Sequence, residues 1–280
     1  CEVLKTEIHD VIVNQTKVQY TAASYDLWDA ILHTDKRLND AGNAIVVWDM
    51  FTDIPSGAEV FEFDHCNDRD GGSCPGGEGQ CYNREHTFPQ SWWGGGTAAA
   101  DTQRVDLHHL VPSDRSLNIS KSNNPPGIVT SPTTTGSNGF KVGSNPSYPC
   151  ATSTYYEPID EYKGDYARMY LYFGTRYEHN MVLWSTITPE GDCAMSGDPY
   201  TCYEPWLLDL LIQWHAADPV STKEIDRNNA IYAIQGNRNP YIDNPQWVSL
   251  IWGDGTNPCD LGINELSNTP KQLVKITDLI

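Results

Sequence analysis

Two short stretches decide the fold of this chain: Arg84-Glu85-His86-Thr87-Phe88-Pro89 and, after a loop, Asp106-Leu107-His108-His109-Leu110-Val111-Pro112. The first sets a carboxylate beside an imidazole, and the second is a short apolar run with further histidines. A polar segment that contains Asn118 follows. Carboxylate and amide oxygens are ligands that hard divalent cations prefer, and histidine supplies a base that titrates near neutrality. This combination of side chains suits the hydrolysis of a phosphodiester.

The same stretches predict a ββα unit. The first strand contains the Glu-His pair, and residues 106–111 are expected to form the second strand. Residues 113–123 would be the helix, with Ser113 or Asp114 as its N-cap and Pro125-Pro126-Gly127 as its stop. Such a helix would aim Asn118 toward the end of the first strand.

The rest of the chain is expected to be mainly helical. Apolar spacing and capping signals predict helices at 24–32, 165–177, 206–217 and 221–235, the last opened by a capping box. A β-branched run at 44–48 predicts a buried strand. Residues 130–154 are expected to form a long surface loop, with a short hairpin at 139–142 as an alternative. The predicted fold class is therefore α+β: a ββα core embedded in a mainly helical single domain with long loops.

Composition and charge reduce the number of possible function classes. Hydrophobic residues make up 39% of the chain, and no apolar run is long enough to span a membrane. The net charge of −19 argues against a nucleic-acid-binding module, which normally carries a basic footprint. An enzyme that cuts nucleic acid needs only a locally positive cleft and its metal. The charge therefore weakens the binding-module interpretation more than the enzyme interpretation.

The 8 cysteines include no C-x-x-C pair, which argues against structural zinc and favours an oxidising compartment. Cys193 and Cys202 bracket a short loop and are predicted to form a local disulfide, worth about 2–3 kcal/mol. The chain opens on Cys1 rather than Met, so we expect that a targeting segment has been removed. We expect a secreted or periplasmic monomer.

A family resemblance rests on three blocks of sequence. The run Tyr82-Asn83-Arg84-Glu85-His86-Thr87-Phe88-Pro89-Gln90-Ser91-Trp92 resembles the bacterial endonuclease I family, secreted or periplasmic nucleases of the ββα-metal (His-Me finger) superfamily. Residues 106–112 are similar to the family's DLHNL-x-P strand, and residues 117–123 to its VN…RSN helix. A third block at 214–243 extends the resemblance over most of the chain. His109 departs from the pattern, because family members often carry Asn there.

The resemblance implies a role for each matching residue. His86 would be the general base that deprotonates the attacking water. Glu85 and Asn118 would hold one divalent cation, Mg²⁺ as the first choice and Mn²⁺ or Ca²⁺ as alternatives. An arginine would grip the phosphate, and Arg104 is our choice as a catalytic residue because it lies nearest in sequence to the metal segment. The products would carry 5′-phosphate and 3′-hydroxyl ends.

Three further residues are candidates for a supporting or phosphate-binding role: His108, Arg227 and Arg238. His108 is followed by another histidine, and consecutive residues of a strand point to opposite faces, so only one of the two could join the site. Each of the two arginines could grip phosphate or could equally form a structural ion pair with Glu224 or Asp243.

These observations predict a secreted, metal-dependent, largely sequence-nonspecific endonuclease that acts on DNA, with RNA as an open alternative. A catalytically inactive binding or adhesion module is the second interpretation, and a zinc hydrolase using several histidines is the third. We assign Trp92 and Trp93 to the core rather than to base stacking. The acidic loop at 64–71 does not match the spacing of an EF-hand and is expected to be solvated.

We place the catalytic domain at residues 1–258 and a tail at 259–280. Within this tail, the stretch from Asn264-Glu265-Leu266 to Thr277-Asp278-Leu279-Ile280 resembles the truncated start of a type IX secretion sorting domain.

Overall fold

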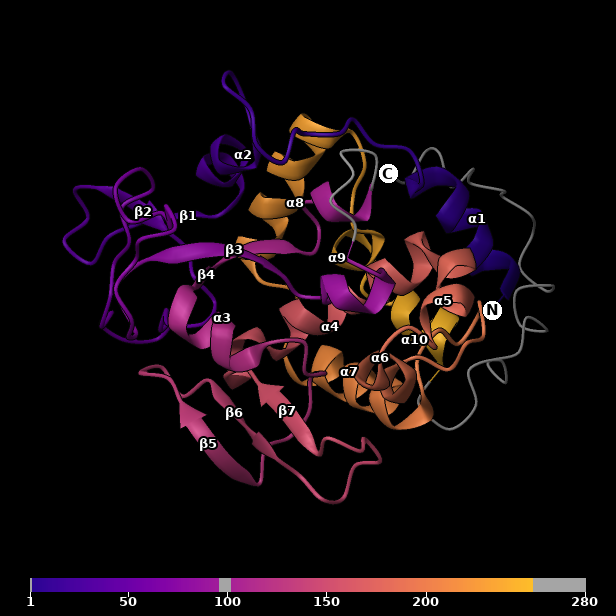
Figure 1. Cartoon of the computed structure of the whole chain (residues 1–280). Coiled ribbons are helices and arrows are strands. Elements are labelled where there is room, and N and C mark those ends of the chain that lie inside the picture. Colours follow the sequence, from indigo (N-terminus) through magenta and orange to yellow (C-terminus); the bar gives the residue numbers. More distant parts are fainter. Residues whose placement is uncertain (1, 96–101, 254–280) are drawn as a thin grey trace.

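The computed structural model describes residues 2–95 and 102–253, and Figure 1 shows their arrangement. The fold is α+β, as predicted. Its helices are α1 (Glu2–Ile12), α2 (Leu27–Thr34), α3 (Arg115–Lys121), α4 (Asp160–Arg176), α5 (Glu178–Trp184), α6 (Pro189–Ala194), α7 (Pro205–Ala217), α8 (Thr222–Gln235), α9 (Pro240–Asp243) and α10 (Trp247–Trp252), with 3₁₀ turns η1 (Gln90–Trp93) and η2 (Gln103–Val105). Its strands are β1 (Lys36–Leu38), β2 (Ile45–Val47), β3 (Tyr82–His86), β4 (Leu110–Asp114), β5 (Ser131–Thr135), β6 (Lys141–Ser144) and β7 (Thr154–Glu157).

The predicted ββα unit is present as β3, β4 and α3. Strands β3 and β4 pair antiparallel, with His86 opposite Leu110. Helix α3 begins where expected, because the side chain of Asp114 accepts a hydrogen bond from the backbone N–H of Leu117 at 2.9 Å. The helix therefore starts directly at the end of β4 and runs back alongside β3.

The second strand starts later than predicted. It occupies Leu110–Asp114 rather than 106–111, and the residues before it form a turn. The carboxylate of Asp106 accepts a hydrogen bond from the backbone N–H of His108 at 3.1 Å, and its carbonyl accepts one from His109 at 3.3 Å. This local bonding competes with strand pairing. The two histidines therefore do not alternate across a strand, and both are buried.

Helix α4 is the centre of the hydrophobic core. Nearly all of its residues are buried, because aromatic side chains cover more than one of its faces. It packs most extensively against α7, and Phe173 stacks on Phe88, with ring centroids 4.1 Å apart. Trp92 and Trp93 join this core from η1, as predicted. The core therefore supports the segment that follows β3.

Residues 130–154 are not the long loop that we predicted. Strands β5, β6 and β7 form an antiparallel sheet, which lies at the lower edge of Figure 1. Strand β5 is mostly exposed, so its residues show no apolar alternation, whereas Val142 and Tyr156 anchor the two other strands in the core. The alternative of a hairpin near 139–142 is confirmed, with the turn between β5 and β6.

The predicted Cys193–Cys202 disulfide is wrong. Cys193 pairs with Cys150, and Cys74 pairs with Cys81. Cys202 is a buried thiol that faces α4. The isolated antiparallel bridge between Met195 and Tyr203 places Cys202 opposite Ser196, whose backbone N–H donates to the carbonyl of Cys202 at 3.1 Å, and not opposite Cys193. Cys1, Cys259 and the whole predicted tail at 259–280 lie outside the described residues.

The remaining helix predictions are largely confirmed. Helix α8 opens with the predicted capping box of Ser221 and Glu224 and ends at Gly236, which has a positive φ. Helix α2 starts at Leu27, three residues later than predicted, with Asp26 as its cap. Among the described residues, none of the helices combines the length and the apolar character needed to cross a membrane.

Candidate active site

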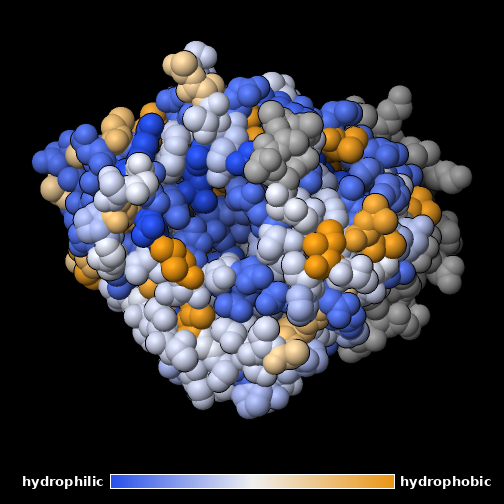
Figure 2. Space-filling view, in the orientation of Figure 1, coloured by the Kyte–Doolittle hydropathy of each residue, from blue (hydrophilic) through white to orange (hydrophobic). Residues whose placement is uncertain are grey.

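A hollow of about 500 Å³ opens between β3, η1 and α3, and we call it the β3–α3 hollow. Figure 2 shows a hydrophilic depression over the position of β3. The residues that line the hollow are Arg84, Glu85, His86, Pro89, Gln90, Ser91, Asn118, Ser122 and Asn123. The structure thus brings together Glu85, His86 and Asn118, which come from two separate sequence blocks.

The imidazole of His86 is held at both nitrogens. Its Nε2 lies 2.8 Å from the backbone carbonyl of Arg104, and its Nδ1 lies 2.9 Å from the amide nitrogen of Gln90. A carbonyl can only accept a hydrogen bond, so Nε2 carries the proton and Nδ1 presents its lone pair. Burial, reinforced by the neighbouring His109, lowers the pKa of His86 well below its ordinary value. The ring is therefore neutral near neutrality, with a basic nitrogen beside Gln90.

Glu85 and Asn118 are fixed by neighbours from the same ββα unit. A carboxylate oxygen of Glu85 lies 2.6 Å from Nζ of Lys121, which is fully buried. The amide nitrogen of Asn118 donates to the side-chain oxygen of Asn83 at 2.8 Å. Burial raises the pKa of Glu85, whereas Lys121 and Asn118 act to lower it. The residues are therefore oriented before any ligand arrives.

This donor set fits a hard divalent cation. The nitrogen of the Asn118 amide is occupied by Asn83, which leaves its oxygen as the possible ligand. Together with the carboxylate of Glu85, it would supply two oxygen donors on the wall of one hollow. Among the described residues, no three side chains of His, Cys, Asp or Glu gather as a metal site. The zinc interpretation, which needs several such ligands, finds no support there.

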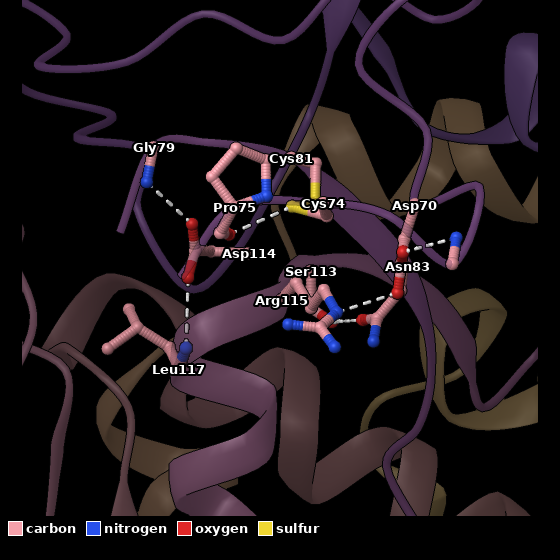
Figure 3. Close-up of a disulfide and its surroundings, with 11 residues drawn as sticks. Asp70, Cys74, Pro75, Gly79, Cys81, Asn83, Ser113, Asp114, Arg115 and Leu117 are labelled. Carbon is pink, nitrogen blue, oxygen red and sulfur yellow. Dashed lines mark hydrogen bonds and ion pairs between the residues drawn. A yellow bond between two sulfur atoms is a disulfide. The ribbon is translucent and has the colours of Figure 1, made fainter. Parts of the chain in front are cut away.

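The loop that leads into β3 is tied to the β4–α3 junction, as Figure 3 shows. The Cys74–Cys81 disulfide lies immediately before β3. One carboxylate oxygen of Asp114 accepts from the backbone of Gly79 at 2.7 Å, while the other caps α3. Arg115 donates to Asp70 at 2.7 Å. These contacts fix where β3 begins and therefore where Glu85 and His86 are presented.

A buried network, which we call the Asp106 cluster, holds the turn before β4. One carboxylate oxygen of Asp106 accepts hydrogen bonds from Tyr172, Arg176 and Tyr177 at 2.8–3.0 Å, and the other accepts from Gln235 at 2.9 Å. Although burial acts to raise the pKa of Asp106, Arg176 and the nearby histidines outweigh it and lower the pKa. The sequence blocks contain Asp106 and Gln235, but their role as an anchor was not predicted.

The other candidate residues lie around this anchor. Nε2 of His108 lies 3.2 Å from the carbonyl of Asn237, and the side chain is buried. Arg227 is also buried and bridges Asp35 and the carbonyls of Leu107 and Leu110. These contacts hold the segment that contains both carbonyls, and neither His108 nor Arg227 lines the β3–α3 hollow.

Arg238 and Arg104 have different surroundings. Arg238 forms a two-bond ion pair with Asp243, one of the partners that we considered, and does not line the hollow. Arg104 contacts His86 through its carbonyl, and its guanidinium lies 3.8 Å from the ring centroid of Tyr20. Gln90 and Lys121 fall inside the blocks quoted above but were not singled out. Nothing in the sequence marks Tyr20.

The arrangement as a whole suits the hydrolysis of an ester of phosphoric acid, because it combines a neutral imidazole with two oxygen donors that fit a cation. A family model for endonuclease I matches residues 1–246, and the chain belongs to that family. It is therefore a nuclease. The extracellular ribonuclease of Bacillus amyloliquefaciens is 32% identical over 259 residues, which cover 89% of this chain and 73% of that protein. The extracellular ribonuclease of Bacillus subtilis (strain 168) is 28% identical over 255 residues, covering 89% and 74%.

Proposed function

We propose that the protein is a secreted, metal-dependent, largely sequence-nonspecific endonuclease that hydrolyses DNA and RNA to 5′-phosphate and 3′-hydroxyl ends. One observation carries the proposal. His86 is neutral, its protonated nitrogen is held by the carbonyl of Arg104, and its basic nitrogen lies at the wall of the hollow that Glu85 and Asn118 share.

His86 would act as the general base. Nδ1 takes a proton from a water that lies where the Gln90 amide now donates. The imidazolium that forms still donates through Nε2 to the carbonyl of Arg104, so the backbone stabilises the new charge. Gln90 is half-buried, and its amide would turn from His86 toward the water. The water is thus oriented by two side chains from one short segment.

Glu85 and Asn118 would hold one divalent cation, with Mg²⁺ as our first choice and Mn²⁺ or Ca²⁺ as alternatives. When bound, the cation would stabilise the negative charge that develops on the phosphate and the leaving oxygen. Lys121 keeps the carboxylate of Glu85 in place and favours its ionised form. Arg104 is our proposal for the residue that grips the phosphate.

The proposed nucleophile is water, so the reaction does not need the 2′-hydroxyl of the substrate. This supports action on DNA as well as RNA, and the similarity to two extracellular ribonucleases adds weight to RNA. Their names also describe extracellular enzymes, and the two disulfides fit an oxidising compartment. Every proposed catalytic group comes from one chain, so a monomer suffices. We keep residues 1–258 as the proposed catalytic domain, with 259–280 as a separate tail.

Cleavage of supercoiled plasmid DNA and of a long RNA tests the proposal. The protein is assayed as isolated, after EDTA treatment, and after adding back excess Mg²⁺, Mn²⁺, Ca²⁺ or Zn²⁺. We expect both substrates to be cut, EDTA to stop cleavage, Mg²⁺ to restore it, and the ends to carry 5′-phosphate. No cleavage of either polymer with any cation would overturn the proposal and favour the inactive binding module. Products with 2′,3′-cyclic phosphate would exclude water as the nucleophile.

A further inference from the structure

Three arginines gather on two aromatic rings beside the β3–α3 hollow, and we call this group the arginine–aromatic cluster: Tyr20, Trp28, Arg69, Arg84 and Arg104. The guanidinium carbon of Arg84 lies 3.9 Å from the ring centroid of Tyr20 and 4.4 Å from that of Trp28. Arg104 lies 3.8 Å from the same Tyr20 ring, and Arg69 lies 5.5 Å from Trp28. Arg84, which lines the hollow, is therefore held by ring faces, and two further arginines contact the same rings.

Most other arginines of the described chain are bound to carboxylates. Arg37, Arg115, Arg168, Arg176, Arg227 and Arg238 each form an ion pair. Within residues 2–95 and 102–253, by contrast, no carboxylate oxygen forms an ion pair with Arg84 or Arg69. Acidic residues outnumber basic ones by 37 to 18 in the chain, so carboxylates are abundant. The composition alone therefore does not explain why these two arginines have no carboxylate partner among the described residues, and the charge of Arg84 faces a hollow that an anion can enter.

Tyr20 links the cluster to the proposed base. Its ring is nearly parallel to that of His86, at 11°, with the centroids 6.2 Å apart. Its backbone carbonyl accepts a hydrogen bond from Arg84. One residue in the segment before α2 thus contacts two arginines and lies next to the site, although nothing in its local sequence indicates a role. Trp28 is held in turn by an edge contact with Tyr82 of β3.

Arg84 is the member of the cluster that lines the hollow, and it is half-buried. Along β3 it lies two residues before His86, on the same face of the strand, and it lines the hollow that Glu85 and Asn118 share. Ring contacts hold a guanidinium plane without neutralising its charge. This leaves its N–H groups able to bind the oxygens of a phosphate in a planar, two-bond geometry.

We propose that Arg84, clamped by Tyr20 and Trp28, binds a backbone phosphate next to the scissile one, and that Tyr20 is the positioning residue for Arg84 and Arg104. The inference rests on the proposed function, because it assumes a polynucleotide in the β3–α3 hollow. It also accounts for how a chain with a net charge of −19 can bind a polyanion.

The test measures binding without cleavage. The affinity of the full chain for a fluorescent DNA duplex is followed by anisotropy in EDTA over a series of salt concentrations. We expect Arg84→Gln to weaken binding about tenfold and to reduce the slope of log K against log salt by about 0.9, the change for one lost phosphate contact. Arg84→Lys should keep the slope but lose part of the affinity, because the charge remains and the planar group does not.

Two matched comparisons make the result specific. Arg238→Gln removes the same charge outside the hollow, and we expect no change in slope. Tyr20→Leu should weaken binding severalfold, while Tyr20→Phe should restore it, since the ring face rather than the hydroxyl positions the arginines. Thermal unfolding of each variant checks that it is folded.

An unchanged slope for the folded Arg84→Gln variant, or an equal loss in Arg238→Gln, would overturn the inference. Because binding is measured in EDTA, its outcome is separate from that of the cleavage assay. A wild-type protein that cuts plasmid but shows no effect of Arg84→Gln leaves the proposed function standing and removes only this inference. If Arg84→Gln weakens binding but the wild-type protein cuts neither polymer, the phosphate-binding role of Arg84 stands and the proposed function is overturned.

Discussion

The β3–α3 hollow and the Asp106 cluster lie on either side of the same segment and use charged and histidine side chains in opposite ways. In the cluster, the carboxylate of Asp106 is fully buried and its oxygens are occupied by hydrogen bonds from Tyr172, Arg176, Tyr177 and Gln235. In the hollow, oxygens of Glu85 and Asn118 line open space, and Nδ1 of His86 is held only by the half-buried amide of Gln90, which would give way to a substrate water. Polar groups whose hydrogen bonds are all made within the protein stabilise the fold, whereas polar groups that face open space can bind a ligand.

The two regions are joined by a short path along the backbone. The turn that the Asp106 cluster holds is preceded by Arg104, whose carbonyl orients His86, and is followed by β4, which pairs with β3. Arg227 fixes the same turn from α8 through the carbonyls of Leu107 and Leu110. The third block of the sequence therefore contributes to the site by holding the elements that present it.

The largest effect is expected from His86→Ala. If His86 is the base, turnover on plasmid DNA should fall by roughly 10²–10⁴-fold, the usual contribution of general base catalysis. The free energy of unfolding should drop by only about 1–2 kcal/mol, since two hydrogen bonds are lost. Activity and urea unfolding are measured on the same preparation.

His179→Ala is the control for this substitution, because that histidine is largely exposed on α5. It should leave both turnover and stability unchanged. Wild-type turnover in the His86→Ala variant would remove His86 as the base and would leave the hollow without a candidate for that role.

That Glu85, His86 and Asn118 would lie together could largely be predicted from the sequence. The Glu-His pair lies in one strand, and the cap at Asp114 lies four residues before Asn118 in the ββα unit, so local rules apply to each segment. The capping box at Ser221 and the long helices were predicted for the same reason. Each of these features depends on residues that are close together in the sequence, so the sequence alone predicts it.

The Asp106 cluster and the role of Arg227 could not be predicted from the sequence, because they depend on contacts between distant segments. Asp106 meets Arg176 of α4 and Gln235 of α8, and Arg227 meets Asp35 rather than either partner considered. No periodicity in the sequence signals such pairs. The same limit explains the wrong disulfide: Cys193 joins Cys150 across 43 positions, while the nearby Cys202 is drawn into the core.

Two errors were local and have local causes. The strand expected at 106–111 was displaced because the Asp106 side chain bonds the backbone of its own turn. The sheet at 131–157 was missed because β5 is exposed and carries Ser, Pro and Thr in place of an apolar alternation. In both regions a polar segment has a defined structure that composition alone does not favour.

The second largest effect is expected from Asp106→Ala, which breaks the Asp106 cluster. Arg176 would be left buried without its carboxylate, and loss of one partner of a buried pair costs about 3–5 kcal/mol. Urea unfolding measures the change. Asp243→Ala is the matched control, because its pair with Arg238 is more exposed, and it should cost less than about 1 kcal/mol. Equal losses in the two variants would refute the distinction between a buried anchor and a peripheral ion pair.

The smallest effect concerns pH and His108, which the fold buries in a neutral form. Burial lowers the pKa of His108 to about 3, against an ordinary value of 6.5. Between these values the unfolded chain binds a proton that the folded chain does not, so the stability contributed by this residue is lost as the pH falls below 6.5. At pH 5 the loss is about 2 kcal/mol relative to pH 7, at about 1.4 kcal/mol per pH unit.

The substitution His108→Gln isolates this contribution, because glutamine cannot be protonated and can still donate to the carbonyl of Asn237. Other buried groups titrate in the same range, and their contributions cancel when the variant is compared with the wild type. We expect the wild type to lose about 2 kcal/mol more than the variant between pH 7 and pH 5 in urea unfolding. An identical pH dependence for the two proteins would show that His108 is not held neutral. The Asp106 cluster would then stabilise a protonated imidazole beside it, and both regions would contain histidines able to exchange a proton.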